Sequence, residues 1–99
     1  MKRAKIVHYD AGEVVHPFGL HMNILLSADD CDDATSVIVA THKPGEGPPP
    51  HFHSDQDEFI YVIEGDYKVS VAGTVQRVGP GSLLFLPANT IHGFENVGT

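Results

Sequence analysis

The apolar residues of this chain come in short runs separated by glycine, proline and polar residues. The runs are rich in β-branched and aromatic residues, and no stretch between the breakers sustains a 3.6-residue apolar period. Short runs bounded by turn residues are typical of β-strands. The pattern therefore predicts an almost helix-free chain with eight strands, at about residues 5–8, 20–26, 35–41, 58–64, 67–71, 75–78, 82–86 and 92–97.

Turn-forming residues join these runs at intervals suited to tight connections. Gly65 and the pair Ala72-Gly73 supply glycine where a turn needs a positive φ angle, and Gly79-Pro80-Gly81 fixes a corner. Eight short strands with this spacing predict an all-β sandwich or barrel. A chain of 99 residues suffices for one hydrophobic core but not for two, so we expect a single domain over residues 1–99.

The charge composition narrows the range of partners. Thirteen acidic and six basic residues give a formal net charge of −7, which repels nucleic acids and anionic membrane surfaces. The sequence has no apolar run long enough to span a bilayer or to form a signal peptide, and its single cysteine, Cys31, has no partner for an internal disulfide. We therefore expect a cytoplasmic protein without nucleic-acid or membrane partners.

Three histidines and one glutamate carry the candidate chemistry. His51 and His53 are two residues apart, so on an extended segment both imidazoles leave the same face and can share one ion. Glu58 is five residues after His53, an odd offset that would place it on the opposite face of a continuous strand. The polar stretch 54–57 is typical of a loop, however, and a new strand after it can present the Glu58 carboxylate beside the two imidazoles. His92, on a later strand, can complete the set. Such ligands suit divalent iron, manganese, cobalt, nickel, copper or zinc, and leave positions free for a substrate.

The alternative for these four residues is a hydrogen-bonded role in the barrel, or an exposed one in a loop, without any ion. Phe94, two residues after His92, shares its face and is either a wall of the metal pocket or a core residue. The remaining histidines lack the ligand spacing, and we interpret them as solvent-facing strand residues, with His21 the one whose strand could reach the mouth of a barrel. They are His8, His16, His21 and His42.

Two segments resemble the signatures of the cupin family. The first signature has fixed glycine, His-x-His, glutamate and glycine positions, and this sequence fills all of them with Gly45, His51, His53, Glu58 and Gly65. In the second signature Asn89 replaces the usual glycine, and asparagine tolerates left-handed backbone geometry better than most residues. The other fixed positions of the second signature hold Gly81, Pro87, His92 and Asn96.

The resemblance implies a double-stranded β-helix, a jelly-roll-like barrel with the same three histidines and Glu58 turned inward toward one metal ion. Small cupins normally continue through one more strand after the second signature. The resemblance therefore also implies that this chain, which stops at Thr99, lacks a final C-terminal strand. Cupins include enzymes of several kinds as well as binding and storage proteins, so family membership leaves the reaction open.

Two functions remain open on these residues. The first is a metal-dependent dioxygenase of quercetinase-like type acting on a small organic substrate, in which Glu58 leaves the metal to take up a proton; an isomerase or a decarboxylase belongs to the same class. The second is a non-catalytic module that binds or senses a small molecule, with a metal that anchors the ligand or stabilises the fold. No second acid or base presents itself as a partner of the four ligands, so neither function prevails.

The run 58–64 has a second apolar face, which can pack on another layer of the same barrel or on a partner subunit; we favour the partner, which predicts a homodimer. On the run 58–64, Ile60 and Val62 share the inward face with Glu58, whereas Phe59, Tyr61 and Ile63 point the other way. A strand missing from the barrel also leaves a sheet edge that can pair with another chain. We expect two chains to join sheet to sheet, and exchange of the N-terminal run 5–8 between them is a further hypothesis.

Overall fold

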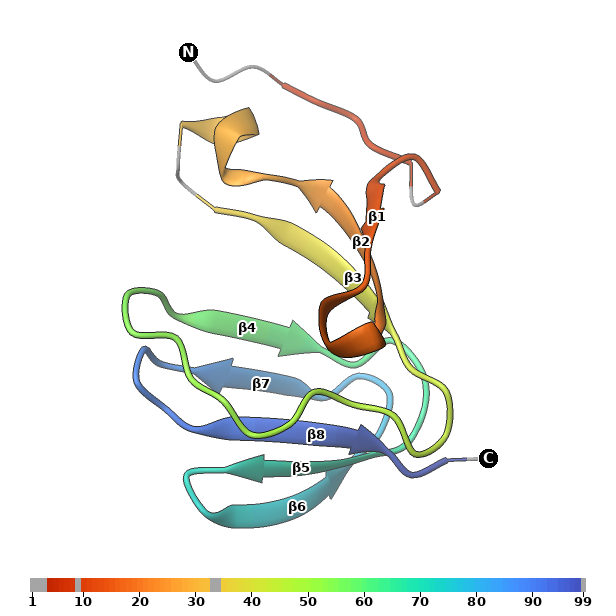
Figure 1. The fold of residues 1–99 in the computed structure, drawn as a ribbon, viewed down its shortest axis with the longest axis vertical. Coiled ribbons are helices and arrows are strands. Elements are labelled where there is room, and N and C mark those ends of the chain that lie inside the picture. The colour runs from red at the N-terminus through yellow and green to blue at the C-terminus, as the bar shows by residue number, and fades with distance from the viewer. Residues whose placement is uncertain (1–3, 9, 33–34, 99) are drawn as a thin grey trace. The chain divides into compact units, whose positions relative to one another are not determined.

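The computed structural model describes residues 4–8, 10–32 and 35–98. Within these ranges the chain forms eight β-strands and two short 3₁₀ helices, which confirms the all-β fold class (Figure 1). The chain divides into two compact units, Met1–Thr41 and His42–Thr99. No helix among the described residues is long and apolar enough to cross a membrane.

The first unit is built on a three-stranded antiparallel sheet in the order β1-β2-β3. The strands are β1 (Glu13–Val15), β2 (His21–Leu26) and β3 (Val37–Thr41). The helix η1 (Pro17–Gly19) joins the first two strands, and η2 (Ala28–Cys31) follows the second. Among the described residues of this unit, Leu20 is the buried apolar one.

The expected strand at residues 5–8 is wrong for this chain, and a strand at β1 was not predicted. Residues 4–8 pair with no strand, and the Ile6 side chain is 89% exposed. A strand is stable only where a neighbouring backbone pairs with its N–H and C=O groups. No described strand lies alongside residues 4–8 to provide these hydrogen bonds. Val14 and Val15 instead form a short ladder with Asn23 and Met22 of β2.

The second unit contains a two-stranded and a three-stranded antiparallel sheet (Figure 1). In the first, β4 (Glu58–Tyr61) pairs with β7 (Leu83–Leu86). In the second, β5 (Tyr67–Val71) lies between β6 (Thr74–Val78) and β8 (His92–Asn96). The five strands fall within or close to the predicted runs because each run is bounded by residues that end a strand.

An extended segment before β4 follows the edge of β8 that β5 leaves unpaired. Gly45 donates its N–H to the Asn96 carbonyl at 2.7 Å, and Asn96 donates to the Glu46 carbonyl at 2.8 Å. At Gly47 a side chain has no room, because a Cβ atom there would collide with the Phe94 carbonyl. Residues 48–50 are prolines without N–H donors, so the regular ladder is interrupted until His51.

Two turns use the left-handed backbone that the sequence suggested. The β5–β6 hairpin turns through Ala72 at φ 49° and Gly73 at φ 85°, as a two-residue connection of twisted strands requires. Asn89, at the position of the usual cupin glycine, has φ 67°. Its turn closes with the Thr90 N–H donating to the Pro87 carbonyl at 3.1 Å.

Strand register separates the inward and outward residues of the second unit. Glu58 lies opposite Leu86 and Ile60 opposite Leu84, so these four share one face. Among the described residues of this unit, the buried ones are Val62, Val69, Leu86, His92 and Gly93. The other face of β4 and β7 carries a group of large apolar side chains that are 51–69% exposed: Phe59, Tyr61, Leu83 and Phe85.

Candidate metal centre

Three histidines from two separate segments converge in the second unit. His51 and His53 lie in the segment before β4, and His92 is the first residue of β8. The backbones of His51 and His92 form an antiparallel bridge, in which each N–H donates to the other residue's carbonyl at 2.8 Å. One ring nitrogen of each of the three histidines lies within 4.8 Å of the others. The geometry can therefore hold one metal ion among three imidazoles.

Backbone carbonyls orient two of the imidazole rings. His51 Nδ1 lies 2.8 Å from the Pro49 carbonyl oxygen, and His92 Nδ1 lies 2.9 Å from the Thr90 carbonyl oxygen. A carbonyl oxygen can only accept, so in each ring Nδ1 is the donor. The opposite nitrogen, Nε2, is then the atom that can coordinate a metal, an arrangement typical of metal-binding histidines.

The Glu58 carboxylate faces the histidines from the start of β4. Its Oε1 atom lies 3.2 Å from His92 Nε2, and its Oε2 atom lies 3.5 Å from His53 Nε2. His92 is only 3% exposed, yet its Nε2 atom makes no hydrogen bond. In a neutral ring whose hydrogen sits on Nδ1, this nitrogen presents a lone pair to an anionic oxygen. Two acceptors at this distance repel each other unless a proton or a metal ion lies between them, so the donor set can hold a cation.

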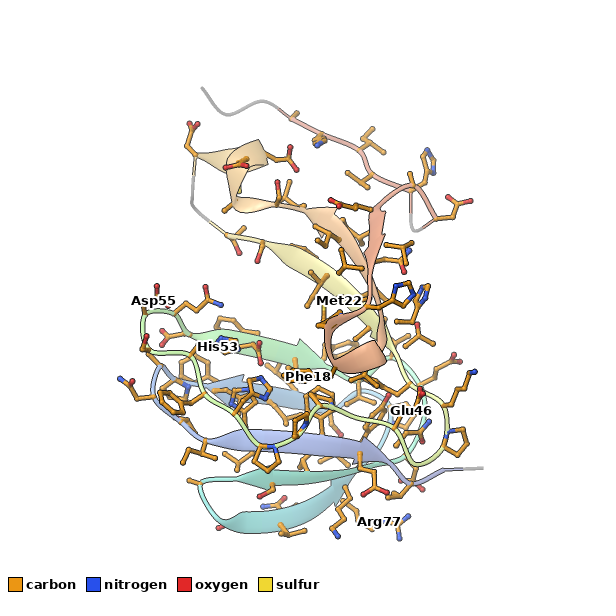
Figure 2. All side chains as sticks on the ribbon, in the orientation of Figure 1. Phe18, Met22, Glu46, His53, Asp55 and Arg77 are labelled. Carbon is orange, nitrogen blue, oxygen red and sulfur yellow. The ribbon has the colours of Figure 1, made fainter. Side chains whose placement is uncertain are left out.

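The polar loop before Glu58 is held in place by the turn before His92. Asn89 donates its N–H to the His53 carbonyl at 2.7 Å, and Ala88 donates to the Asp57 carboxylate at 2.9 Å. Figure 2 shows His53 in this stretch, with Asp55 at its bend. The loop therefore turns the chain between His53 and β4, as the sequence suggested, and brings Glu58 to the imidazoles.

A second polar pair in this unit was not foreseen. His42 was expected to face solvent on a strand, but it follows β3 and is half-buried, so that expectation was wrong. Its Nδ1 atom lies 2.9 Å from the Tyr67 hydroxyl, and its ring meets the Phe94 ring edge-on at 5.5 Å between centroids. Burial lowers the pKa of His42, although the nearby Glu46 carboxylate opposes this, and burial raises the pKa of Tyr67.

His42 lies on no strand, and a tertiary contact places it beside Tyr67: the Asn96 side-chain amide donates to the His42 carbonyl at 2.8 Å, and Asn96 is the cross-strand partner of Tyr67. No local signal in the sequence could therefore have identified the pair. Phe94 packs against both rings, which makes it part of the interior on the His92 face of β8. The other three histidines, His8, His16 and His21, are exposed as expected, but only His21 lies on a strand.

The cupin family accounts for this arrangement. The family described as "Cupin domain" matches residues 38–99, which include both sheets of the second unit and all four candidate ligands. The chain belongs to the cupin family, as its two signatures indicated.

A solved structure of a predicted oxalate decarboxylase from Thermotoga maritima superposes with a TM-score of 0.85 at 20% identity. The match covers 96% of this chain and 90% of the other. At this identity the likeness establishes the fold, a jelly-roll-like cupin barrel, and leaves the activity open.

Two curated relatives resemble the chain in sequence. A mannose-1-phosphate guanylyltransferase of Escherichia coli K12 is 31% identical over 87% of this chain, and a quercetin 2,3-dioxygenase of Bacillus subtilis 168 is 27% identical over 78%. The chain spans only 17% and 23% of the lengths of these relatives.

Proposed function

We propose that this cupin binds one divalent transition-metal ion, iron, manganese, nickel, cobalt, copper or zinc, through His51, His53, Glu58 and His92. The observation that supports this proposal is the buried His92 Nε2 atom, which has no hydrogen bond and lies 3.2 Å from Glu58 Oε1. A metal ion bound there satisfies the nitrogen lone pair and neutralises the carboxylate.

We infer further that the site catalyses a dioxygenase reaction of quercetinase-like type on a small organic substrate. For this reaction the ion would be iron, manganese or nickel, which would supply Lewis-acid and redox chemistry for a reaction with O2. The backbone carbonyls of Pro49 and Thr90 hold two rings in place. Glu58 is the proposed catalytic residue, because each of its oxygens faces a histidine and its side chain is 28% exposed. It can take a proton from the substrate at one oxygen and release it to solvent.

The likeness to a quercetin 2,3-dioxygenase supports this choice of reaction for the first test. Oxygen uptake is measured with the metal-loaded protein over a panel of phenols, diketones and sugars. Uptake that needs both metal and substrate supports the dioxygenase. Glu58→Gln keeps the size of the side chain but removes the proton acceptor, so we expect turnover to fall by about 10²- to 10⁴-fold. Metal-loaded protein that consumes no oxygen with any panel member contradicts the proposal.

A non-catalytic binding module is the second candidate. It is favoured by the scarcity of acid–base groups: among the described residues, Glu58 is the carboxylate facing the imidazoles. An isomerase or a decarboxylase commonly needs a further acid or base. A compound that binds the metal-loaded protein without being converted supports the module over the enzyme.

We also propose that two chains associate through the outward face of β4 and β7. Four large apolar side chains form this face, and the Phe59 and Phe85 rings lie 4.9 Å apart across the two strands. No charged side chain belongs to this set of four, so two copies can bury the face against each other without desolvating an ion. The chain's net charge of −7 opposes association through its acidic surfaces.

The single-domain organisation and the cytoplasmic location remain proposals. One cupin domain over residues 1–99 is supported by the family match, which begins at residue 38 within β3 of the first unit. The single cysteine supports a reducing compartment. Exchange of residues 5–8 between two chains stays a prediction.

A further inference from the structure

A cavity of about 260 Å³ opens in the second unit between strands β5 and β6 on one side and strand β7 on the other. From β5 it is lined by Val69 and Val71, and from β7 by residues 83–86. β6 completes the lining with Thr74, Gln76 and Val78. Val69 and Leu86 are buried, whereas Thr74 and Gln76 are exposed, so the polar pair lies where the cavity meets solvent.

The cavity begins next to the candidate metal centre. Val71 is the cross-strand partner of His92, and Leu86 is the cross-strand partner of Glu58. Directly opposed residues in an antiparallel pair have Cβ atoms about 4.5 to 5.5 Å apart. None of the four candidate ligands lines the cavity, but two lining residues are immediate neighbours of two of them, so the cavity lies one side chain away from the ligand cluster.

The lining sets the chemistry of what can bind. Apart from Thr74 and Gln76, its side chains are aliphatic or aromatic, and none of the described lining residues is charged. A charged group placed here loses its hydration without gaining a partner, and this costs far more free energy than burying an apolar group. The volume lies just below the range of about 300 to 1,000 Å³ typical of pockets for drug-sized ligands, so the cavity suits a smaller molecule.

We propose that this cavity selects an uncharged, largely apolar compound of one or two rings, with one oxygen directed at the His–Glu cluster. Thr74 and Gln76 can accept or donate one hydrogen bond to a substituent at the open end. Dicarboxylates and sugar phosphates are excluded by their charge. This inference rests on the proposed function, because it assigns the substrate class of the same metal site.

The test measures binding of 2-naphthol to the cobalt-loaded protein by calorimetry. The comparison ligand is 6-hydroxynaphthalene-2-sulfonate, which has the same rings and hydroxyl but carries a charge at the far end. We expect the sulfonate to bind at least about tenfold more weakly. Equal or tighter binding of the sulfonate overturns the proposal.

Variants locate the binding. Val71→Phe fills the cavity beside His92, and Gln76→Trp obstructs its open end at an exposed position where folding is not at risk. Both should weaken 2-naphthol binding at least about tenfold. The control is Val75→Phe, on the same strand as Gln76 but facing outward and 55% exposed, which should leave the affinity unchanged. If Gln76→Trp and Val75→Phe bind equally well, the ligand is not in this cavity.

Cobalt absorption separates the two possible failures. Protein that takes up cobalt but binds 2-naphthol no better than the sulfonate refutes the substrate class and leaves the metal site intact. Protein that takes up no cobalt refutes the proposed function. In that case the ligand comparison, repeated on metal-free protein, still decides whether the cavity selects uncharged rings.

Discussion

His51 and His92 are joined backbone to backbone, each donating its N–H to the other's carbonyl at 2.8 Å. Their ring centroids lie 4.4 Å apart. The segment that carries the His-x-His pair is thereby fixed to the first residue of β8, independently of any ion. The metal centre can therefore be assembled by the fold before metal binds, which makes ligand substitutions informative without loss of the strand pairing.

Metal should stabilise the protein through His92. When an ion binds only the folded state and its free concentration is 100 times its dissociation constant, binding adds about 2.7 kcal/mol to the free energy of unfolding. His92→Ala removes a buried candidate ligand, so we expect zinc or cobalt to raise the melting temperature of the wild type but not of this variant.

The control for that experiment is His16→Ala, because His16 is exposed and lies outside the cluster. It should respond to metal as the wild type does. An unchanged metal response in His92→Ala would show that the ligands have been assigned wrongly.

His42 should make stability depend on pH. Burial lowers its pKa below the ordinary 6.5, so the folded protein binds a proton at His42 less readily than the unfolded chain does. As pH falls below about 6.5, the unfolded state gains protons first and the free energy of unfolding decreases until the folded pKa is passed. Above that window the contribution of neutral His42 is fully retained.

The comparison is between wild type and His42→Gln, which stays neutral and can still hydrogen-bond Tyr67. Urea unfolding is measured from about pH 5 to pH 8 with a chelator present, so that both proteins are free of metal. The stability of the wild type relative to the variant should fall on acidification. A constant difference across this range would mean that His42 titrates normally in the folded protein.

The β5–β6 turn is strained at Ala72. Its φ of 49° is left-handed, which costs roughly 1–2 kcal/mol for a residue with a Cβ atom, whereas asparagine tolerates this region better. Ala72→Asn should therefore raise the free energy of unfolding by about 0.5–1 kcal/mol. Ala72→Val, which is β-branched, should lower it. Urea denaturation measures both, and the opposite order of stabilities would refute a left-handed turn at this position.

The outward face of β4 and β7 should govern self-association. We expect light scattering at micromolar concentration to give twice the 10.7 kDa chain mass for the wild type. Phe59→Asp places a charge in the middle of the face and should yield monomers, because a buried unpaired charge is costly. Val75→Asp, at an exposed apolar position on β6, is the matched control and should remain dimeric. A wild type with the mass of one chain would exclude a stable dimer.

The strands and the candidate ligands of the second unit could be predicted because their signals are local. Alternation with period two assigned Glu58 and Ile60 to one face and Phe59 and Tyr61 to the other, which the β4–β7 register confirms. Asn89 was expected to tolerate a left-handed backbone and does so at φ 67°. Spacing alone identified His51 and His53 as a pair, since residues two apart on an extended chain share a face.

The N-terminal part was predicted less well. The run 5–8 has the composition of a strand but pairs with no strand among the described residues, whereas β1 is three residues long and is held by its ladder to β2. Whether a short segment forms a strand depends more on the backbone that pairs with it than on its own residues.

By itself, the sequence determined which residues are available for metal binding and where the chain turns, because backbone preferences and side-chain alternation act over a few residues. Only the tertiary structure decided which of those residues meet. The position of Val71 beside His92 depends on strand register. The 3.2 Å approach of His92 to Glu58 and the His42–Tyr67 pair depend on packing, because each joins segments that do not pair with each other in a sheet. Register is fixed by hydrogen bonds and packing between segments far apart in the chain, which no local pattern encodes.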